Sequence, residues 1–213
     1  MRTEPLIDQL ASDLKPVRRR TVWGDALLLL GLCAAEIALF LSLGMLRDDM
    51  PMAMHQPSFW WKLTSLGMIA AVSGCVAVLS LDPLRSPRRG LALVAALFGL
   101  SLAAGWLLDA SRDGLANLIV RLNWISGVQC VGKMVALSIP PVAAFCILMK
   151  RGAPIDRGGT AMASGAAAAA WGAFVFVFAC PFEDPLYITV WYSLGCSLVT
   201  LFARLVLPRI ARW

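Results

Sequence analysis

Long apolar runs alternate with short polar segments along most of the chain. A helix needs about 20 mostly apolar residues to cross the ~30 Å hydrocarbon core of a bilayer. The pattern predicts six such spans, at residues 24–46, 63–81, 91–108, 130–149, 161–179 and 187–207. The expected fold is therefore all-α: a polytopic membrane protein with six transmembrane helices over residues 23–213, preceded by a short arm at residues 1–22.

Composition supports this reading. Of the 213 residues, 59% are hydrophobic and 15% are charged, whereas soluble domains carry roughly 25% charged residues. No large soluble domain remains outside the spans. The net charge of +6 does not indicate nucleic-acid binding, because membrane proteins concentrate lysine and arginine in cytoplasmic loops. The N-terminus does not resemble a cleavable signal peptide, since a long polar arm precedes a run that can span the membrane.

Lysine and arginine are divided unequally between alternate connections. With the N-terminus in the cytoplasm, 14 of the 19 fall in inner segments and 5 in outer ones. The outer five are Arg47, Lys62, Arg112, Arg121 and Lys133. Because positive charge accumulates on the cytoplasmic side, we expect a multi-pass membrane protein with both termini in the cytoplasm.

The N-terminal arm carries an apolar stripe at helical spacing, which ends before Pro16. The stripe consists of Leu6, Ile7, Leu10 and Leu14. A helix this short is marginal in water and forms when its apolar face docks on something. Two interpretations stay open: a helix lying on the membrane surface, or a peptide ligand that folds in a groove of a soluble partner. The mostly acidic polar side favours the partner.

The last two spans are joined by a tight turn that begins Cys180-Pro181 and continues with Glu183 and Asp184. A second cysteine, Cys130, opens the fourth span at the same predicted outer surface. Four other cysteines lie inside spans, where cysteine usually serves as a small apolar filler. Since spans four and five are consecutive and antiparallel, we expect the sulfurs of Cys130 and Cys180 to lie at one depth.

A thiol pair at an oxidising surface can close a disulfide, or it can bind a soft metal ion together with Glu183 or Asp184. Lys133, one helical turn after Cys130, would favour the thiolate. Two cysteines at helix edges can also coincide by chance, so the residues alone leave a functional pair open.

Three further features stand out. Glu36 lies near the middle of the first span. It could be a proton or ion site, or it could make a hydrogen-bonded contact between helices. We favour the helix contact because no second ionisable residue lies at mid-depth. Pro140 and Pro141 should kink or break the fourth span. The outer segment with Met50, Met52, Met54 and His55 is a weak soft-metal candidate.

Other functions remain as alternatives. A small transporter would be built around Glu36, but transporters usually show discontinuous helices in paired halves. A membrane thiol oxidoreductase would use Cys130 and Cys180, but the chain has no Cys-x-x-Cys motif. A purely structural membrane subunit is also compatible. We expect no enzyme activity and no cofactor.

Several short motifs, in order along the whole chain, resemble the NrsF-type membrane anti-sigma factors of proteobacteria. The matching stretches are LIDQLASDLKPVRR at 6–19, Cys130, Ser138-Ile139-Pro140-Pro141, Arg151-Gly152-Ala153-Pro154, Cys180-Pro181 and Asp184-Pro185-Leu186, with Trp191 and Tyr192. The resemblance implies that the protein holds an extracytoplasmic-function sigma factor of the sigma-F kind at the inner membrane. It also implies that Cys130 and Cys180 respond to heavy-metal or oxidant stress and that their modification releases the sigma factor.

From these observations we predict a mechanism. Oxidation or metal binding at Cys130 and Cys180 shifts the packing of spans four and five. A metal ion would bind there only as the signal, and not as a permanent cofactor. Pro140 and Pro141 supply the hinge through which the change reaches the inner face. The arm then releases the sigma factor. The sequence does not indicate whether the membrane protein itself forms oligomers.

Overall fold

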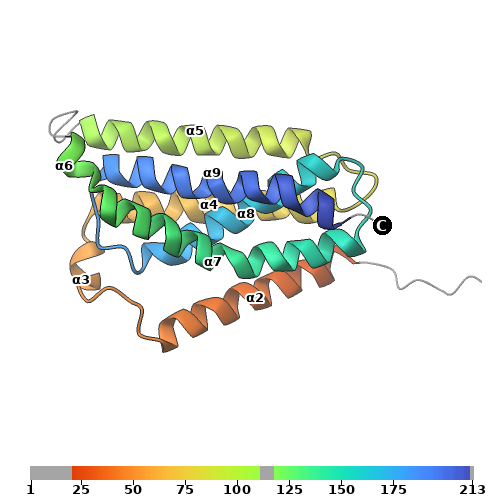
Figure 1. The fold of residues 1–213 in the computed structure, drawn as a ribbon, viewed down its shortest axis with the longest axis horizontal. Coiled ribbons are helices and arrows are strands. Elements are labelled where there is room, and N and C mark those ends of the chain that lie inside the picture. The colour runs from red at the N-terminus through yellow and green to blue at the C-terminus, as the bar shows by residue number, and fades with distance from the viewer. Residues whose placement is uncertain (1–20, 111–117, 212–213) are drawn as a thin grey trace, which may run out of the picture.

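The computed structural model describes residues 21–110 and 118–211, which form a bundle of helices (Figure 1). Six helices in these ranges are long and apolar enough to cross a membrane. They are α2 (Val22–Ser42), α4 (Pro57–Ser80), α5 (Arg88–Ala110), α7 (Trp124–Arg151), α8 (Arg157–Val177) and α9 (Pro185–Ile210). Two short helices, α3 (Met50–Ala53) and α6 (Leu118–Leu122), lie in the connections. The expected all-α fold is confirmed, as is the expectation of six helices that could each span a membrane. The arm helix with Leu6, Ile7, Leu10 and Leu14 lies outside the described residues.

Most helices begin earlier than the hydropathy pattern predicts. Helix α7 begins at Trp124, not at residue 130, because Asn123 caps it: the Asn123 side chain accepts a hydrogen bond from Ser126 N at 3.4 Å. Asn123 adopts a left-handed conformation with φ of 34°, which asparagine tolerates better than most residues. Apolar runs therefore locate the part of each helix suited to hydrocarbon, and polar caps extend the helices beyond it.

Helix α8 lies at the centre of the bundle and contacts α4, α7 and α9. Most of its side chains are buried, and many are alanine or glycine. A Cβ atom at Gly172 would lie 2.8 Å from the carbonyl oxygen of Met134, and one at Gly165 would lie 3.0 Å from Cα of Thr200. Small residues let membrane helices approach closely, so the composition of α8 explains its central position.

Helix α2 lies at the periphery (Figure 1). Phe40 is its only buried residue, and Leu27 and Leu30 are each 65% exposed. A polar contact joins α2 to the centre: Trp171 Nε1 on α8 donates a hydrogen bond of 2.9 Å to Glu36. Glu36 thus makes the packing contact that the sequence favours.

Helix α7 runs without interruption through Pro140 and Pro141, so the two prolines do not break it. The helix changes direction near its middle (Figure 1), as expected where two backbone donors are missing. Nearby, Ser138 donates a hydrogen bond of 2.8 Å to the Met134 carbonyl. A hinge at these prolines stays a prediction.

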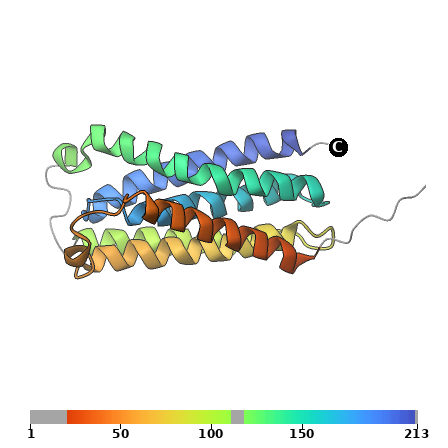
Figure 2. The ribbon, with the colours of Figure 1, turned by 90° about the horizontal axis from the view of Figure 1, so that it is seen from below.

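The helices place the connections at two opposite ends of the bundle. The start of α2 and the end of α9 lie at one end, and α3, α6 and the α8–α9 connection lie at the other (Figures 1 and 2). An even number of antiparallel helices requires this arrangement. Which end faces the cytoplasm stays a prediction from the charge distribution.

Candidate functional site

The connection between α8 and α9, residues 178–184, is a tight turn that we call the thiol hairpin. It begins where the Cys180 N–H donates to the Phe176 carbonyl at 3.0 Å, after which Pro181 cannot continue the helical hydrogen bonds. It ends where the Asp184 side chain accepts a hydrogen bond of 2.9 Å from Leu186 N and caps α9. Pro185 occupies the first turn of that helix, where proline is favoured.

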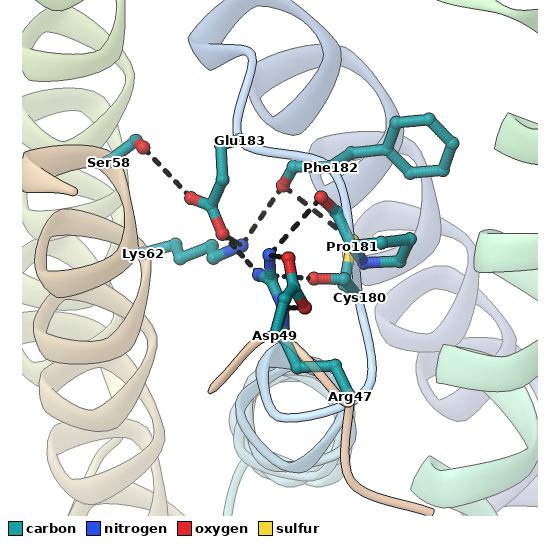
Figure 3. Close-up of polar contacts among 8 residues, drawn as sticks. All are labelled: Arg47, Asp49, Ser58, Lys62, Cys180, Pro181, Phe182 and Glu183. Atoms are coloured by element: carbon teal, nitrogen blue, oxygen red, sulfur yellow. Dashed lines mark hydrogen bonds and ion pairs between the residues drawn. The ribbon is translucent and has the colours of Figure 1, made fainter. Parts of the chain in front are cut away.

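The hairpin carboxylate Glu183 is bound by three donors from other parts of the chain (Figure 3). Arg47 pairs with it, Lys62 Nζ lies 3.1 Å from Oε1, and Ser58 Oγ donates to Oε2 at 2.9 Å. The side chains of Arg47 and Lys62 are only 4% and 0% exposed. Buried cations are costly unless they are paired, so Glu183 makes the burial of both possible.

Arg47 also binds the hairpin backbone. Its Nη1 donates to the Cys180 carbonyl at 2.9 Å, and its own N–H donates to the Phe178 carbonyl at 3.0 Å. The rest of its guanidinium forks onto Asp49, at 2.6 and 2.7 Å, and this pairing holds the pKa of Asp49 below its usual range. Since Arg47 lies five positions after the last residue of α2, Ser42, it joins the segment that follows α2 to the thiol hairpin.

A second ionic cluster holds the other side of the hairpin. Arg121 donates to both oxygens of Asp184, at 2.8 and 2.6 Å, and also pairs with Asp109 at the end of α5. Burial raises the pKa of Asp184, but the hydrogen bonds from Arg121 and from Leu186 N–H outweigh it, so the net pKa is lowered. The hairpin is thus anchored to α3–α4 by Glu183 and to α5–α6 by Asp184.

The two predicted thiols lie together beneath this hairpin. Cys130 is 5% exposed and Cys180 is 0% exposed, and both belong to one buried cluster. The Tyr187 hydroxyl donates to Cys130 Sγ at 3.2 Å, and the Tyr187 ring stacks on Phe182 with centroids 4.4 Å apart. All six cysteines of the chain carry free thiols. The structure thus brings Cys130 and Cys180 together as a reduced pair.

The electrostatic surroundings favour a thiolate at Cys180. Its pKa is lowered, first because the Cys130 thiol hydrogen-bonds to it; burial opposes this, and the positive charge of Lys62 and the Tyr192 hydroxyl add to the lowering. A thiolate with a thiol beside it can be oxidised to a disulfide or can bind a soft cation. Because both sulfurs are buried, access for a reagent requires the hairpin to open.

The other predicted supporting residues fall in different places. Lys133 has an exposed side chain on α7 and its charge acts on Cys130, as predicted, but only as a minor influence; the cation that acts on Cys180 is Lys62. Glu183 and Asp184 lie in the hairpin, but their carboxylate oxygens are already paired with arginine and lysine side chains. Among the described residues, no group of three or more histidine, cysteine, aspartate or glutamate side chains could hold a metal. Metal binding by Cys130 and Cys180 stays a prediction that now rests on the two sulfurs.

The outer methionine segment has a structural role in part. Met50 is packed in the same buried cluster as the thiols, whereas Met52 is 71% and Met54 is 48% exposed. His55 is also exposed. The segment forms α3 and covers the edge of the hairpin region, so the soft-metal idea gains no support.

Sequence reasoning missed four residues that hold the site: Arg47, Lys62, Arg121 and Tyr187. A signal for the cations was present, because Arg47, Lys62 and Arg121 are three of the five basic residues that depart from the positive-inside distribution. Two carboxylates in a short apolar hairpin also call for partners. Tyr187 had no such signal, since an aromatic residue at a helix start is common at membrane interfaces.

Comparisons with known proteins give matches over nearly the whole chain. A family model described as "NrsF: Negative regulator of sigma F" matches residues 10–213. The chain is 29% identical over 222 residues to "Anti-sigma-F factor NrsF" of Caulobacter vibrioides, and 30% identical over 220 residues to "Probable anti-sigma-F factor NrsF" of Azospira oryzae. Each alignment covers 100% of this chain and 100% of the relative. No solved structure matches the chain.

Proposed function

The chain belongs to the NrsF family of negative regulators of sigma F, and we propose that it is a membrane anti-sigma factor whose signal receiver is the pair Cys130 and Cys180. It holds an extracytoplasmic-function sigma factor at the bacterial inner membrane, away from RNA polymerase, until the thiols react. The family is regulatory, not enzymatic, and the full-length relatives carry the same description. The single observation that carries the sensor role is the burial of Cys130 and Cys180 as free thiols in one cluster.

The chemistry at the pair takes one of two forms. In oxidation, the thiols lose two protons and two electrons to an external oxidant such as dichromate and form one disulfide bond. In metal binding, the sulfurs lose their protons and ligate a soft cation such as cadmium. Either reaction replaces the hydrogen bond between the sulfurs, so it stabilises a different packing of the hairpin.

The change has two routes to the opposite end of the bundle. One is α7, which carries Cys130 and bends near Pro140 and Pro141, the proposed hinge. The other is Arg47, which binds the Cys180 carbonyl at 2.9 Å and lies in the segment that joins α2 to α3, α2 being the helix that the N-terminal arm precedes. Coupling between distant sites of this kind commonly amounts to 1–3 kcal/mol.

The output is the N-terminal arm, with both termini in the cytoplasm. Its stripe docks in a groove of the sigma factor as an amphipathic helix. The docking residues are Leu6, Ile7, Leu10 and Leu14. When the hairpin is altered, the arm and the neighbouring inner loops present a different surface and the sigma factor dissociates.

Replacing the thiols tests the receiver. Cys130→Ser and Cys180→Ser, singly and together, should abolish induction of sigma-dependent transcription by dichromate or cadmium while repression in unstressed cells persists. Cys146→Ser is the matched control on the same helix, about 24 Å from Cys130 at ~1.5 Å rise per residue, and should respond normally. Normal induction in the double variant would remove the sensor assignment.

Charging the arm tests the output. Leu10→Asp and Leu14→Asp place carboxylates on the docking face and should give constitutive sigma-dependent transcription, with no sigma factor co-purifying. Ser12→Asp adds the same charge on another face and should leave repression intact. Repression that persists with both leucines replaced would place the binding surface elsewhere.

A further inference from the structure

An apolar groove opens on the side of the bundle between α5 and the helices α4, α8 and α9. It has a volume of about 330 Å³. Its walls include Ile69 on α4, Ala95 on α5, Ala166 on α8 and Leu201 on α9. A smaller cavity of about 30 Å³ shares Leu66, Ile69, Phe98 and Cys196 with it, so the space continues toward the thiol end. The groove exists because α5 packs mainly on α4 and only lightly on α8.

The groove becomes polar toward one end. Along α9 its lining runs from Cys196 through Ser197 and Thr200 to Arg204. Along α5 it includes Leu91, and Arg88 lies three positions earlier, on the same helix face. Both arginines are exposed, and they lie near the end of the bundle opposite the thiol hairpin. The groove thus combines apolar walls with a basic mouth.

These two arginines differ from Arg47 and Arg121 in their partners. Within the described residues, Arg88 and Arg204 make no ion pair with a carboxylate. The Arg204 guanidinium instead lies against the Met162 thioether, with Nη1 3.7 Å from Sδ, and a thioether is a weak acceptor. A guanidinium with this much unused donor capacity matches the oxygens of a phosphate, which accepts two parallel hydrogen bonds.

We propose that the groove is a binding site for an anionic phospholipid, whose headgroup phosphate is bound by Arg204 and Arg88 and whose acyl chain lies along Ala95, Ala166 and Ile69. Thr200 lies between the arginine and the apolar wall, where the ester groups of such a lipid would be. Basic pockets between transmembrane helices are established sites for anionic headgroups. This lipid would fill the space between α5 and α8, which contact each other only lightly, whereas α5 packs directly on α4 and α9. The site does not depend on the thiols, so its failure would leave the proposed function untouched.

The test uses the full chain, purified in detergent and stripped of lipid, with two probes of identical acyl chains: phosphatidylglycerol and phosphatidylcholine. Phosphatidylglycerol should raise the thermal unfolding midpoint more than phosphatidylcholine and should remain bound in native mass spectrometry. In Arg204→Gln the affinity for phosphatidylglycerol should fall about tenfold, as loss of one charged hydrogen-bonding group implies. Arg209→Gln removes an arginine of the same helix that does not line the groove, so it should behave as the wild type.

A second pair of variants tests the acyl chain separately. Ala95→Trp fills the groove from an exposed position, and should reduce retention of both lipids. Ala96→Trp, one position along and outside the groove, should not. Equal stabilisation by the two lipids, or equal behaviour of Arg204→Gln and Arg209→Gln, would overturn the proposal. A dimer that retains no lipid and dissociates in Ala95→Trp would also overturn it, since a second copy would then cover the groove.

Discussion

The thiol hairpin and helix α2 are neighbours along the path through Arg47, yet they are held very differently. The hairpin is bound by cations on both sides: Lys62 and Arg47, at 0% and 4% side-chain exposure, pair with Glu183, and Arg121 pairs with Asp184. Helix α2 buries a single residue, Phe40. The protein therefore buries a network of polar contacts around the two sulfurs, whereas the helix nearest the N-terminal arm is mostly exposed.

This difference is consistent with the proposed roles, in which the thiol hairpin receives the signal and α2 moves in response. A buried ionic network has few alternative arrangements, so a new bond at Cys180 disturbs several contacts at once. A helix with little buried surface shifts at low cost. Variants of the hairpin anchors and of α2 can therefore measure how much each region contributes to the stability of the fold.

The largest effect is expected from Glu183→Ala. It leaves Arg47 and Lys62 buried without their shared carboxylate, and removing one partner of a buried ion pair costs about 3–5 kcal/mol. The midpoint of chemical unfolding in detergent should fall accordingly. Asp48→Ala removes an exposed carboxylate near Arg47. It should leave the free energy of unfolding within about 0.5 kcal/mol of the wild-type value. Similar midpoints for both variants would show that the ionic cluster does not hold the hairpin.

Glycine replacements compare the centre of the bundle with its periphery. Gly172→Ala on α8 places a methyl group 2.8 Å from the Met134 carbonyl oxygen, and such overpacking costs about 1–3 kcal/mol. Gly31→Ala on α2 meets nothing within 4 Å, and alanine's higher helix propensity should leave stability unchanged or up to about 1 kcal/mol higher. The same unfolding assay measures both, and equal losses would contradict the loose packing of α2.

The pH dependence of thiol reactivity tests the charge around Cys180. In a chain that keeps Cys130 and Cys180 as its only cysteines, modification by a small methanethiosulfonate should follow a titration of Cys180 with a midpoint below the ~8.5 of a free cysteine. Lys62→Gln removes a positive charge that stabilises the thiolate, so the midpoint should rise and the rate at neutral pH should fall by up to about tenfold. Lys133→Gln should leave the midpoint of Cys180 in place. A midpoint that moves with Lys133 but not with Lys62 would refute this account of the charge.

The smallest effect is expected from Leu30→Ala on α2. Leu30 is 65% exposed and faces away from the other helices, so unfolding should change by less than about 0.5 kcal/mol. Phe40→Ala, which empties the one buried position of α2, should cost more than Leu30→Ala because it leaves a cavity, yet less than Glu183→Ala. If Leu30→Ala proved as damaging as Phe40→Ala, α2 would have a partner on its outer face.

Apolar runs were enough to predict the six helices and the proximity of Cys130 to Cys180, because span length and antiparallel order determine which residues share a depth. The ionic anchors could not be predicted in the same way. Arg47 and Glu183 are separated by most of the chain, and a single sequence carries no record of which distant charges pair. The orientation count used Arg47, Lys62 and Arg121 only as outer charges, whereas in the structure each of them pairs with a carboxylate.

Tyr187 shows a second limit. Its role comes from a hydroxyl that donates to Cys130 Sγ at 3.2 Å, and that geometry depends on how α9 rotates after its Asp184 cap. The continuity of α7 through Pro140 and Pro141 is a third case, since neighbouring helices support a backbone that local rules alone would interrupt.

The central claim is that Cys130 and Cys180 receive the signal as one unit and that their reaction releases the sigma factor. The direct measurement is to oxidise membranes that contain the complex, then map disulfides by mass spectrometry and quantify the retained sigma factor in the same sample. The account predicts a bond between Cys130 and Cys180 within one chain, formed in proportion to the sigma factor lost. Full release with both sulfurs unbridged and unmodified would contradict it.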